Sequence, residues 1–259
     1  MTDVLIVVAH PDDAEIAMGM RMREHALTGD RVRVHCLSPG APTPEGAEQR
    51  RSECLAAAAL LGVAQYTFSH IPDNEFVDRR VEINRELFRV FGERRPDIVY
   101  THFPGDQHLD HRITADEVTT VALREADNLR YFRSPYSHAF DPTEVFVGTP
   151  ALLQSKAEAL RCFASQTQLD MDTFMTLATV AHRQYVHHRV VERFPAGHTC
   201  AELFRTARTI QFAARRAGER SLVSVPGVLT AVPPLRPEAS VEVEQPEVER
   251  SRGRLRGDE

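Results

Sequence analysis

The apolar positions of this chain form short continuous runs, separated by longer segments with helical spacing. The first run, Val4–Ala9, is rich in β-branched residues and shows no polar alternation. Such a run is typical of a strand buried on both faces of a parallel sheet. Similar runs recur along the chain. They predict further strands at Arg31–Ser38, Tyr66–Ser69, Ile98–Thr101, Leu129–Phe132 and Val145–Val147.

The segments between these runs carry apolar residues three and four positions apart. The first one stops at Gly29, a favourable residue just after a helix end. Strands that alternate with helices of this length form right-handed βαβ units. We therefore predict an α/β fold, Rossmann-like and three-layered, with a mostly parallel sheet. The predicted helices are Glu15–Thr28, Ala47–Leu61, Arg79–Arg94, Ile113–Ala126, Thr149–Phe163 and Glu202–Arg215.

The composition changes beyond Gly218, where Pro, Val, Glu and Arg predominate without a sustained helix or strand period. Such a segment is typical of a linker or a weakly ordered tail. The sequence therefore predicts one domain over residues 1–217 and a tail over residues 218–259. A tail of this kind either ends freely or lies across a neighbouring subunit, so a homo-oligomer stays an open alternative.

Charge and cysteine content narrow the class of protein. The net charge is −6 and the pI is about 6.1, without the clustered positive charge that nucleic-acid binding requires. No apolar stretch approaches the roughly 18 residues of a membrane span. The start has no basic segment typical of a signal peptide, and the four cysteines are widely spaced without a CxxC pair. These features predict a cytoplasmic protein with reduced thiols.

Polar residues that can bind a ligand or take part in a reaction follow the first predicted strand directly. His10, Pro11, Asp12 and Asp13 come where the apolar run ends, and ligands bind at the carboxyl ends of strands in open α/β sheets. Pro11 favours a sharp turn in which consecutive side chains point in different directions. One aspartate can then bind a metal beside His10 while the other faces a reacting water. The alternative is that one of them merely caps the following helix.

A second polar group follows the strand predicted at Ile98–Thr101. His108, Asp110 and His111 lie in the segment THFPGDQHLDHR, again at a strand's carboxyl end. Two such ends can meet in one parallel sheet. His10, Asp13 and His111 would then supply two nitrogens and one carboxylate oxygen, a ligand set typical of a catalytic zinc.

The sequence resembles a known family in several segments: AHPDDAEIAMG, the Arg and Glu of RRSE, IPDNEF, RPDIVYTHFPGDQHLDHR and AELFRTAR. This family is the LmbE-like, or PIG-L, group of zinc-dependent deacetylases that act on N-acetylglucosamine conjugates. The resemblance extends roughly from Val4 to Arg208. It implies a hydrolase with a Zn²⁺ cofactor, or Fe²⁺ in its place, and a small amino-sugar conjugate as substrate.

The resemblance also implies roles for single residues. His10, Asp13 and His111 match the metal ligands of the family. Asp12 matches the general base, which takes a proton from water and returns one to the leaving amine.

Four more positions match the family's active site. His108 matches the residue that stabilises the tetrahedral intermediate, with Asp110 behind it. Arg50 and Asp73 match residues that contact the substrate. On spacing alone, Arg50 would equally suit a solvated helix face.

Functions of other classes stay open at this point. A metal-dependent phosphoesterase would use His102 and Asp106 to hold a second ion. An iron oxygenase would use two histidines and a carboxylate. A catalytically idle sugar-binding module is another alternative, although no binding role requires Asp12. We reject a second metal site at His182, His187 and His188, because no carboxylate joins them at ligand spacing.

Overall fold

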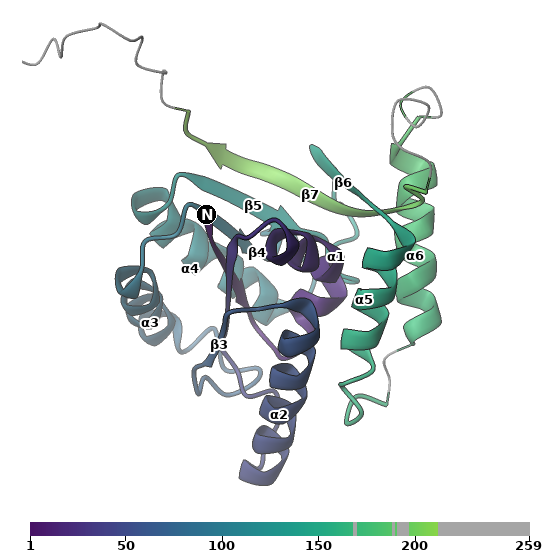
Figure 1. The fold of residues 1–259 in the computed structure, drawn as a ribbon. Coiled ribbons are helices and arrows are strands. Elements are labelled where there is room, and N and C mark those ends of the chain that lie inside the picture. The colour runs from purple at the N-terminus through teal and green to yellow at the C-terminus, as the bar shows by residue number, and fades with distance from the viewer. Residues whose placement is uncertain (168–169, 188–189, 191–196, 212–259) are drawn as a thin grey trace, which may run out of the picture. The chain divides into compact units, whose positions relative to one another are not determined.

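The computed structural model describes residues 1–211, except 168–169, 188–189 and 191–196. Predicted features that lie beyond these residues, including the tail at 218–259, are outside the described part of the chain. Figure 1 shows helices on both sides of a central sheet. The strands are β1 (Asp3–Val8), β2 (Arg31–Cys36), β3 (Gln65–Phe68), β4 (Ile98–Thr101), β5 (Asn128–Phe132), β6 (Glu144–Gly148) and β7 (Cys200–Thr209). The helices are α1 (Asp13–Leu27), α2 (Pro44–Leu61), α3 (Arg80–Glu93), α4 (Leu109–Glu125), α5 (Pro150–Leu160) and α6 (Met171–Tyr185).

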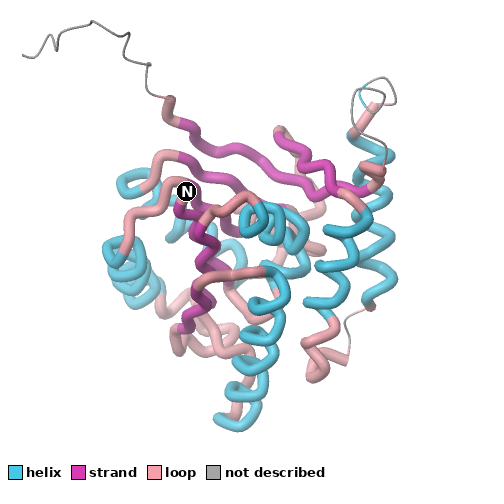
Figure 2. The backbone as a smooth tube through the Cα atoms, viewed as in Figure 1, coloured by secondary structure: helices cyan, strands magenta, loops and turns pink. Residues whose placement is uncertain are grey.

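The sheet has the strand order β3-β2-β1-β4-β5-β7-β6. Strands β1 to β5 pair in parallel, whereas β7 pairs antiparallel with both β5 and β6. The α/β class, the three layers and the mostly parallel sheet are confirmed. Figure 2 shows the strands enclosed by helices, as parallel sheets require.

Strand β1 lies at the centre because both of its faces are apolar. Its alternate residues Val4, Ile6 and Val8 pack against α1, α2 and α5. Leu5 and Val7 point to the other face and pack against α3 and α4. Each such side chain contributes about 1.5–3 kcal/mol when fully buried. The double burial explains why the run has no polar alternation, and it fixes the position of the residues that follow Val8.

The helix predicted at Glu202–Arg215 is wrong, because residues Cys200–Thr209 form β7. The first five residues of this strand are all buried, and only the second half alternates in exposure. Ala201, Glu202 and Leu203 also favour helices in isolation. Pairing with β5 on one side and β6 on the other overrides that local preference.

Helix α6 was not predicted, and it completes the layer beside α5. Asp170 caps its start by accepting hydrogen bonds from the backbone N–H groups of Asp172 and Thr173. Its buried residues Ala178 and Ala181 pack into two small apolar clusters that include residues of β7. Helix α6 therefore packs against β7, the strand that the sequence analysis did not predict.

Helix α1 is broken inside its length at Met18, where φ is −145° and ψ is 26°. The backbone N–H groups of Met20 and Arg21 donate instead to the Glu202 carboxylate on β7, at 3.0 and 2.9 Å. Lys156 Nζ on α5 lies 2.8 Å from the same carboxylate. A carboxylate from a distant strand thus serves as the cap of the second half of α1.

None of the helices in the described ranges is both long and apolar enough to cross a membrane. All four cysteines are free thiols, as predicted.

Candidate active site

The turn after β1 places two adjacent carboxylates differently. Asp12 occupies the left-handed region with φ 88°, and its side chain makes no capping hydrogen bond to α1. A non-glycine residue in this conformation costs on the order of 1–3 kcal/mol. The Asp13 carboxylate turns back and accepts a hydrogen bond from the His10 backbone N–H at 2.8 Å. The alternative in which Asp12 only caps the helix therefore has no support in the structure.

The ends of β1 and β4 meet because these strands are parallel neighbours, with Ile6 opposite Tyr100. His111, in the first turn of α4, places Nε2 at 3.3 Å from Asp13 Oδ1. His10 Nδ1 lies 3.6 Å from Asp13 Oδ2. The two polar segments separated by about a hundred residues in the sequence thus form one cluster, as the strand ends predicted.

The cluster offers the donor atoms that a divalent metal requires. Among the described residues, three groups have potential ligand atoms within 4.8 Å of one another. Imidazole nitrogens and carboxylate oxygens are the ligands of zinc and of non-haem iron sites. The predicted set of His10, Asp13 and His111 shares members with all three groups. The groups are His10, His108 and His111; Asp13, His102 and His111; and His10, Asp73 and Asp110.

Two carboxylates orient His10. Its Nε2 lies 2.9 Å from Asp73 Oδ1 and 3.3 Å from Asp110 Oδ2. Asp110 also accepts a hydrogen bond from the Asn74 backbone N–H at 2.8 Å. Metal-binding histidines usually donate their second ring N–H to a carboxylate in this way. The sequence prediction placed Asp110 behind His108, whereas the hydrogen bonds of its carboxylate go to His10 and Asn74.

His108 lies at the start of α4, with its ring centroid 5.0 Å from that of His10 and 4.4 Å from that of His111. Its backbone N–H donates to Asp106 Oδ1 at 2.9 Å. Its Nδ1 is buried without a hydrogen-bond partner in the described structure. The imidazole thus borders the cluster and can make a hydrogen bond to a bound ligand.

Asp106 has a positioning role that the sequence analysis did not assign to it. Its Oδ2 accepts hydrogen bonds from the hydroxyls of Ser134 and Ser137. The same oxygen lies 3.5 Å from His111 Nδ1, on the side of the ring away from Asp13. Asp106 therefore lies beside the ring of His111, as Asp110 lies beside the ring of His10. The signal in the sequence was its place in the same loop, after β4.

His102 directly follows β4 and is completely buried. The Ala9 backbone N–H donates to its Nε2 at 3.1 Å, so this nitrogen acts as an acceptor. Burial lowers the pKa of His102 to about 4. His102 is therefore a neutral imidazole, and it stacks on His111 with the two ring centroids 3.9 Å apart.

The carboxylates raise the pKa of two imidazoles. Burial alone would lower the pKa of His10, but hydrogen bonds to carboxylates, that of Asp110 first, raise it well above its usual value. Burial is likewise outweighed at His111, where Asp13 and Asp106 raise the pKa to about 9. The cluster therefore favours positive charge at this point, which a divalent cation would also supply.

The two aspartates of the turn differ in their protonation. Burial opposes ionisation of Asp13, but the nearby His111 holds its pKa well below the usual range. Burial, together with the charge of Asp13, raises the pKa of Asp12 to about 7. One carboxylate is therefore an anion fixed among imidazoles, and the other exchanges protons more readily.

A pocket of about 460 Å³ opens over this cluster; we call it the site pocket. Arg50 of α2 reaches it and places Nη1 3.5 Å from Asp12 Oδ2. Gly40 has φ 67°, and a Cβ there would lie 2.6 Å from Pro11 Cδ, so only glycine fits. The lining residues are His10, Asp12, Asp13, Ile16, Gly40, Arg50, Asp73, His108, His111, Pro135, Tyr136, Gln166 and Phe174.

The second group of histidines gives no metal site in the described part of the chain. His182 and His187 belong to none of the ligand groups found there. His188 lies outside the described residues.

Comparisons with known proteins found a family match and a similar protein. Residues 5–122 match the family described as PIG-L: GlcNAc-PI de-N-acetylase. The uncharacterized deacetylase YaiS of Escherichia coli is 24% identical over 139 residues, which are 51% of this chain and 74% of that protein. The range of the family match, residues 5–122, contains all eight residues predicted for the site.

Two solved structures show the same fold. The 4-carboxy-2-hydroxymuconate hydratase GalB of Pseudomonas putida superposes with a TM-score of 0.67 at 20% identity, covering 84% of this chain and 100% of that chain. The N,N'-diacetylchitobiose deacetylase of Pyrococcus horikoshii has a TM-score of 0.59 at 21% identity, covering 79% of this chain and 83% of that chain. At these identities the likeness extends to the fold alone.

Proposed function

We propose that this chain, whose residues 5–122 are a PIG-L (LmbE-like) family domain, is a zinc-dependent N-deacetylase. Its substrate would be a small molecule or glycoside that contains N-acetylglucosamine. The observation that carries the proposal is the meeting of the two strand ends, which brings His111 to 3.3 Å from Asp13 while Asp12 faces the site pocket. Zinc is the metal we propose, with Fe²⁺ as the alternative.

His10, Asp13 and His111 would hold the metal. Asp73 and Asp110 fix the ring of His10, and Asp106 lies beside the far nitrogen of His111. A divalent cation bound there supplies a Lewis acid that acidifies water and polarises a carbonyl oxygen.

Asp12 is the residue we assign as general base. It takes a proton from the attacking water as the oxygen bonds to the carbonyl carbon, and it returns a proton to the nitrogen as the C–N bond breaks. Acetate and a free amine leave. Arg50 lies 3.5 Å from Asp12 and holds that carboxylate on the pocket side.

His108 would donate a hydrogen bond to the oxyanion that develops on the carbonyl oxygen. A donor of this kind contributes about 3 kcal/mol in other acyl-transfer enzymes. Arg50 and Asp73 both line the site pocket and would bind sugar hydroxyls.

The phosphoesterase alternative is less well supported. It requires His102 and Asp106 to hold a second ion, but His102 Nε2 already accepts the Ala9 N–H, and Asp106 Oδ2 accepts two serine hydroxyls. The fold also occurs in a hydratase, so the fold alone does not select amide hydrolysis. The family match over the site residues favours the deacetylase.

The proposal is tested by amine release from N-acetylglucosamine and N,N'-diacetylchitobiose, measured beside zinc content. Asp13→Ala should lower zinc occupancy and activity together. Asp12→Asn should keep its zinc and lose activity on the order of 100- to 10,000-fold. Asp116→Asn, at an exposed carboxylate of α4, is the matched control and should change neither quantity.

Full activity of Asp12→Asn would remove it as the base. Unchanged zinc in Asp13→Ala would remove it from the ligand set. Activity that survives a chelator would contradict metal dependence.

A further inference from the structure

A second cavity of about 180 Å³ opens beside the site pocket; we call it the side chamber. The two share three lining residues, Ile16, Pro135 and Phe174. Each of these belongs to a different part of the chain: α1, the loop after β5, and α6. The chamber is thus continuous with the place where the proposed reaction occurs.

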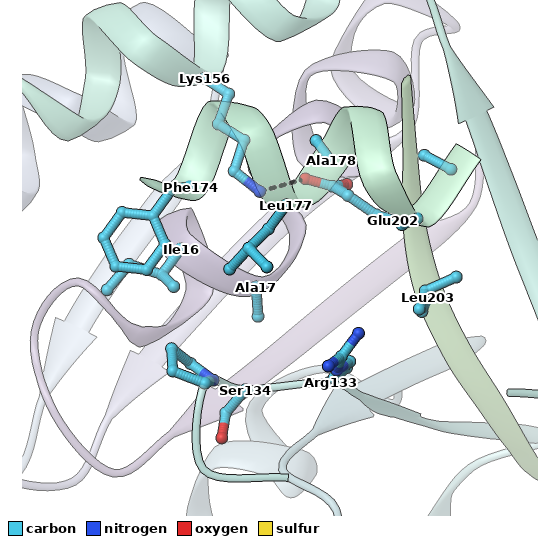
Figure 3. A pocket seen from close by; sticks show the side chains of 13 residues that line it. Ile16, Ala17, Arg133, Ser134, Lys156, Phe174, Leu177, Ala178, Glu202 and Leu203 are labelled. Carbon is cyan, nitrogen blue, oxygen red and sulfur yellow. Dashed lines mark hydrogen bonds and ion pairs between the residues drawn. The ribbon is translucent and has the colours of Figure 1, made fainter. Parts of the chain in front are cut away.

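Nine of the thirteen residues that line the chamber are apolar, and they form one continuous part of its wall with Arg133, Ser134, Lys156 and Glu202 beside them. Figure 3 shows Ile16 and Ala17 of α1 facing Phe174 and Leu177 of α6. Ala178, Ala181, Ala201 and Leu203 line the remaining wall. An apolar wall of this kind excludes hydrated groups and favours an alkyl or aryl group.

Three charged residues line the chamber: Arg133 is exposed to solvent, and Lys156 and Glu202 pair with each other. Lys156 Nζ and Glu202 Oε1 are 2.8 Å apart, and Figure 3 shows this pair at one side of the cavity. The remaining acceptor capacity of Glu202 goes to the backbone N–H groups of Met20 and Arg21. The pair therefore completes the wall, and it does not require a charged ligand.

The size of the chamber sets the size of its occupant. An apolar protein cavity of about 150 Å³ is large enough to bind benzene. At about 180 Å³, the side chamber suits a phenyl ring or an alkyl chain of similar volume. A single methyl group, as in an acetyl substituent, would leave most of it unfilled.

The arrangement of the site pocket indicates which end of the substrate enters the side chamber. The wall with Arg50, Asp73 and Gln166 is polar and suits a polyhydroxylated amine. The aliphatic and phenyl side chains in the lining of the site pocket are those it shares with the side chamber. The acyl side of the amide therefore faces the chamber when the sugar faces the polar wall.

We propose that the side chamber binds the acyl chain of the substrate, so that amides with an acyl group of about four to seven carbons are preferred over acetamides. This inference rests on the proposed function. The reaction stays a hydrolysis: water oxygen bonds to the acyl carbon, the C–N bond breaks, and a proton passes to the amine. A medium-chain or aromatic carboxylate is released instead of acetate.

The test is a series of N-acyl glucosamines that carry acetyl, butanoyl, hexanoyl and benzoyl groups. Amine release is measured with the full-length zinc-loaded protein. Each methylene that becomes buried improves binding about 4-fold, so kcat/KM should rise on the order of 100-fold from acetyl to hexanoyl. A ratio of hexanoyl to acetyl kcat/KM below about 2 would overturn the proposal.

A pair of variants on α6 connects the preference to the chamber. Leu177 lines the chamber but is 42% exposed, so a larger residue is tolerated there. Leu177→Trp should lower the ratio of hexanoyl to acetyl kcat/KM at least 10-fold. Thr176→Trp, on the exposed side of the same helix, should leave the ratio unchanged. An unchanged ratio in Leu177→Trp would also overturn the proposal.

Calorimetric binding separates this inference from the proposed function. N-hexanoylglucosamine should bind at least 10-fold more tightly than N-acetylglucosamine, and Leu177→Trp should remove the difference. Tighter binding of N-hexanoylglucosamine without any amine release would support acyl binding in the side chamber and contradict the proposed deacetylase activity. Equal affinities together with acetamide hydrolysis would contradict the chamber alone.

Discussion

Replacing Lys156 by methionine should destabilise the protein strongly. Lys156 is the only lysine among the 259 residues, and its side chain is 4% exposed beside a Glu202 side chain that is 2% exposed. Methionine keeps the aliphatic stem, which packs so closely on Gly19 that a Cβ there would lie 3.0 Å from Lys156 Cγ. The substitution therefore removes the charge and little of the packing.

The expected magnitude follows from what remains around Glu202. Breaking a buried ion pair from one side typically costs about 3–5 kcal/mol, because the other charge stays buried. The N–H groups of Met20 and Arg21 still donate to the carboxylate, so we expect about 3 kcal/mol. Lys156→Met combined with Glu202→Gln removes both charges and keeps one acceptor oxygen. The double variant should recover at least about 1 kcal/mol of that loss.

The measurement is urea unfolding of the full-length chain, with the free energy of unfolding extrapolated to water. Gln154→Met, at an exposed position of the same helix α5, is the control and should stay within about 0.5 kcal/mol of the parent. A loss below about 1 kcal/mol in Lys156→Met would refute the reasoning. So would a double variant that is less stable than Lys156→Met alone.

Two further predictions concern the site and the pH dependence. Arg50→Ala should raise KM for amino-sugar amides at least 10-fold and keep the zinc content, and loss of zinc would contradict its assignment to the substrate. Asp73→Ala should raise KM and also lower the zinc content, because Asp73 lies 2.9 Å from His10 Nε2; unchanged zinc would contradict the role of this contact. Burial and the charge of nearby Arg89 lower the pKa of His35 to about 4 against the opposing effect of Glu86, so its contribution to stability is complete above the unfolded pKa of about 6.5 and is lost as pH falls toward 4. The free energy of unfolding should fall between pH 7.5 and pH 5 by about 2 kcal/mol less in His35→Gln than in the parent, and equal falls would contradict the assignment.

The sequence predicted the parallel part of the sheet from β1, which is buried and reads as a continuous apolar run, and from the alternation of short strands with helices. It also indicated that the segments after β1 and β4 can meet, and the strand order of the structure brings these two ends together. Asp12 and Asp13 could be assigned different tasks from their place in a turn, and the structure gives them different surroundings.

The remainder depended on contacts between distant segments. Glu202 looks like a helical surface residue in the sequence, and only the gap between β5 and β6 makes it part of a strand. Asp110 was placed behind His108 on the family resemblance, but its carboxylate accepts hydrogen bonds from His10 and from the Asn74 backbone N–H instead. The roles of Asp106 and of helix α6 likewise required the loop at Ser134 and the strand β7 to be in place.

The cap of α1 joins residues that the ribosome delivers at very different times. The N–H of Met20 and the carboxylate of Glu202 are 182 positions apart, whereas His10, Asp13 and His111 all belong to the first half of the chain. During synthesis, which proceeds at roughly 5–20 residues per second, the residues proposed as metal ligands emerge several seconds before the carboxylate that caps the second half of α1. A nascent chain therefore contains the residues proposed for the site before it contains Glu202, which caps the second half of α1.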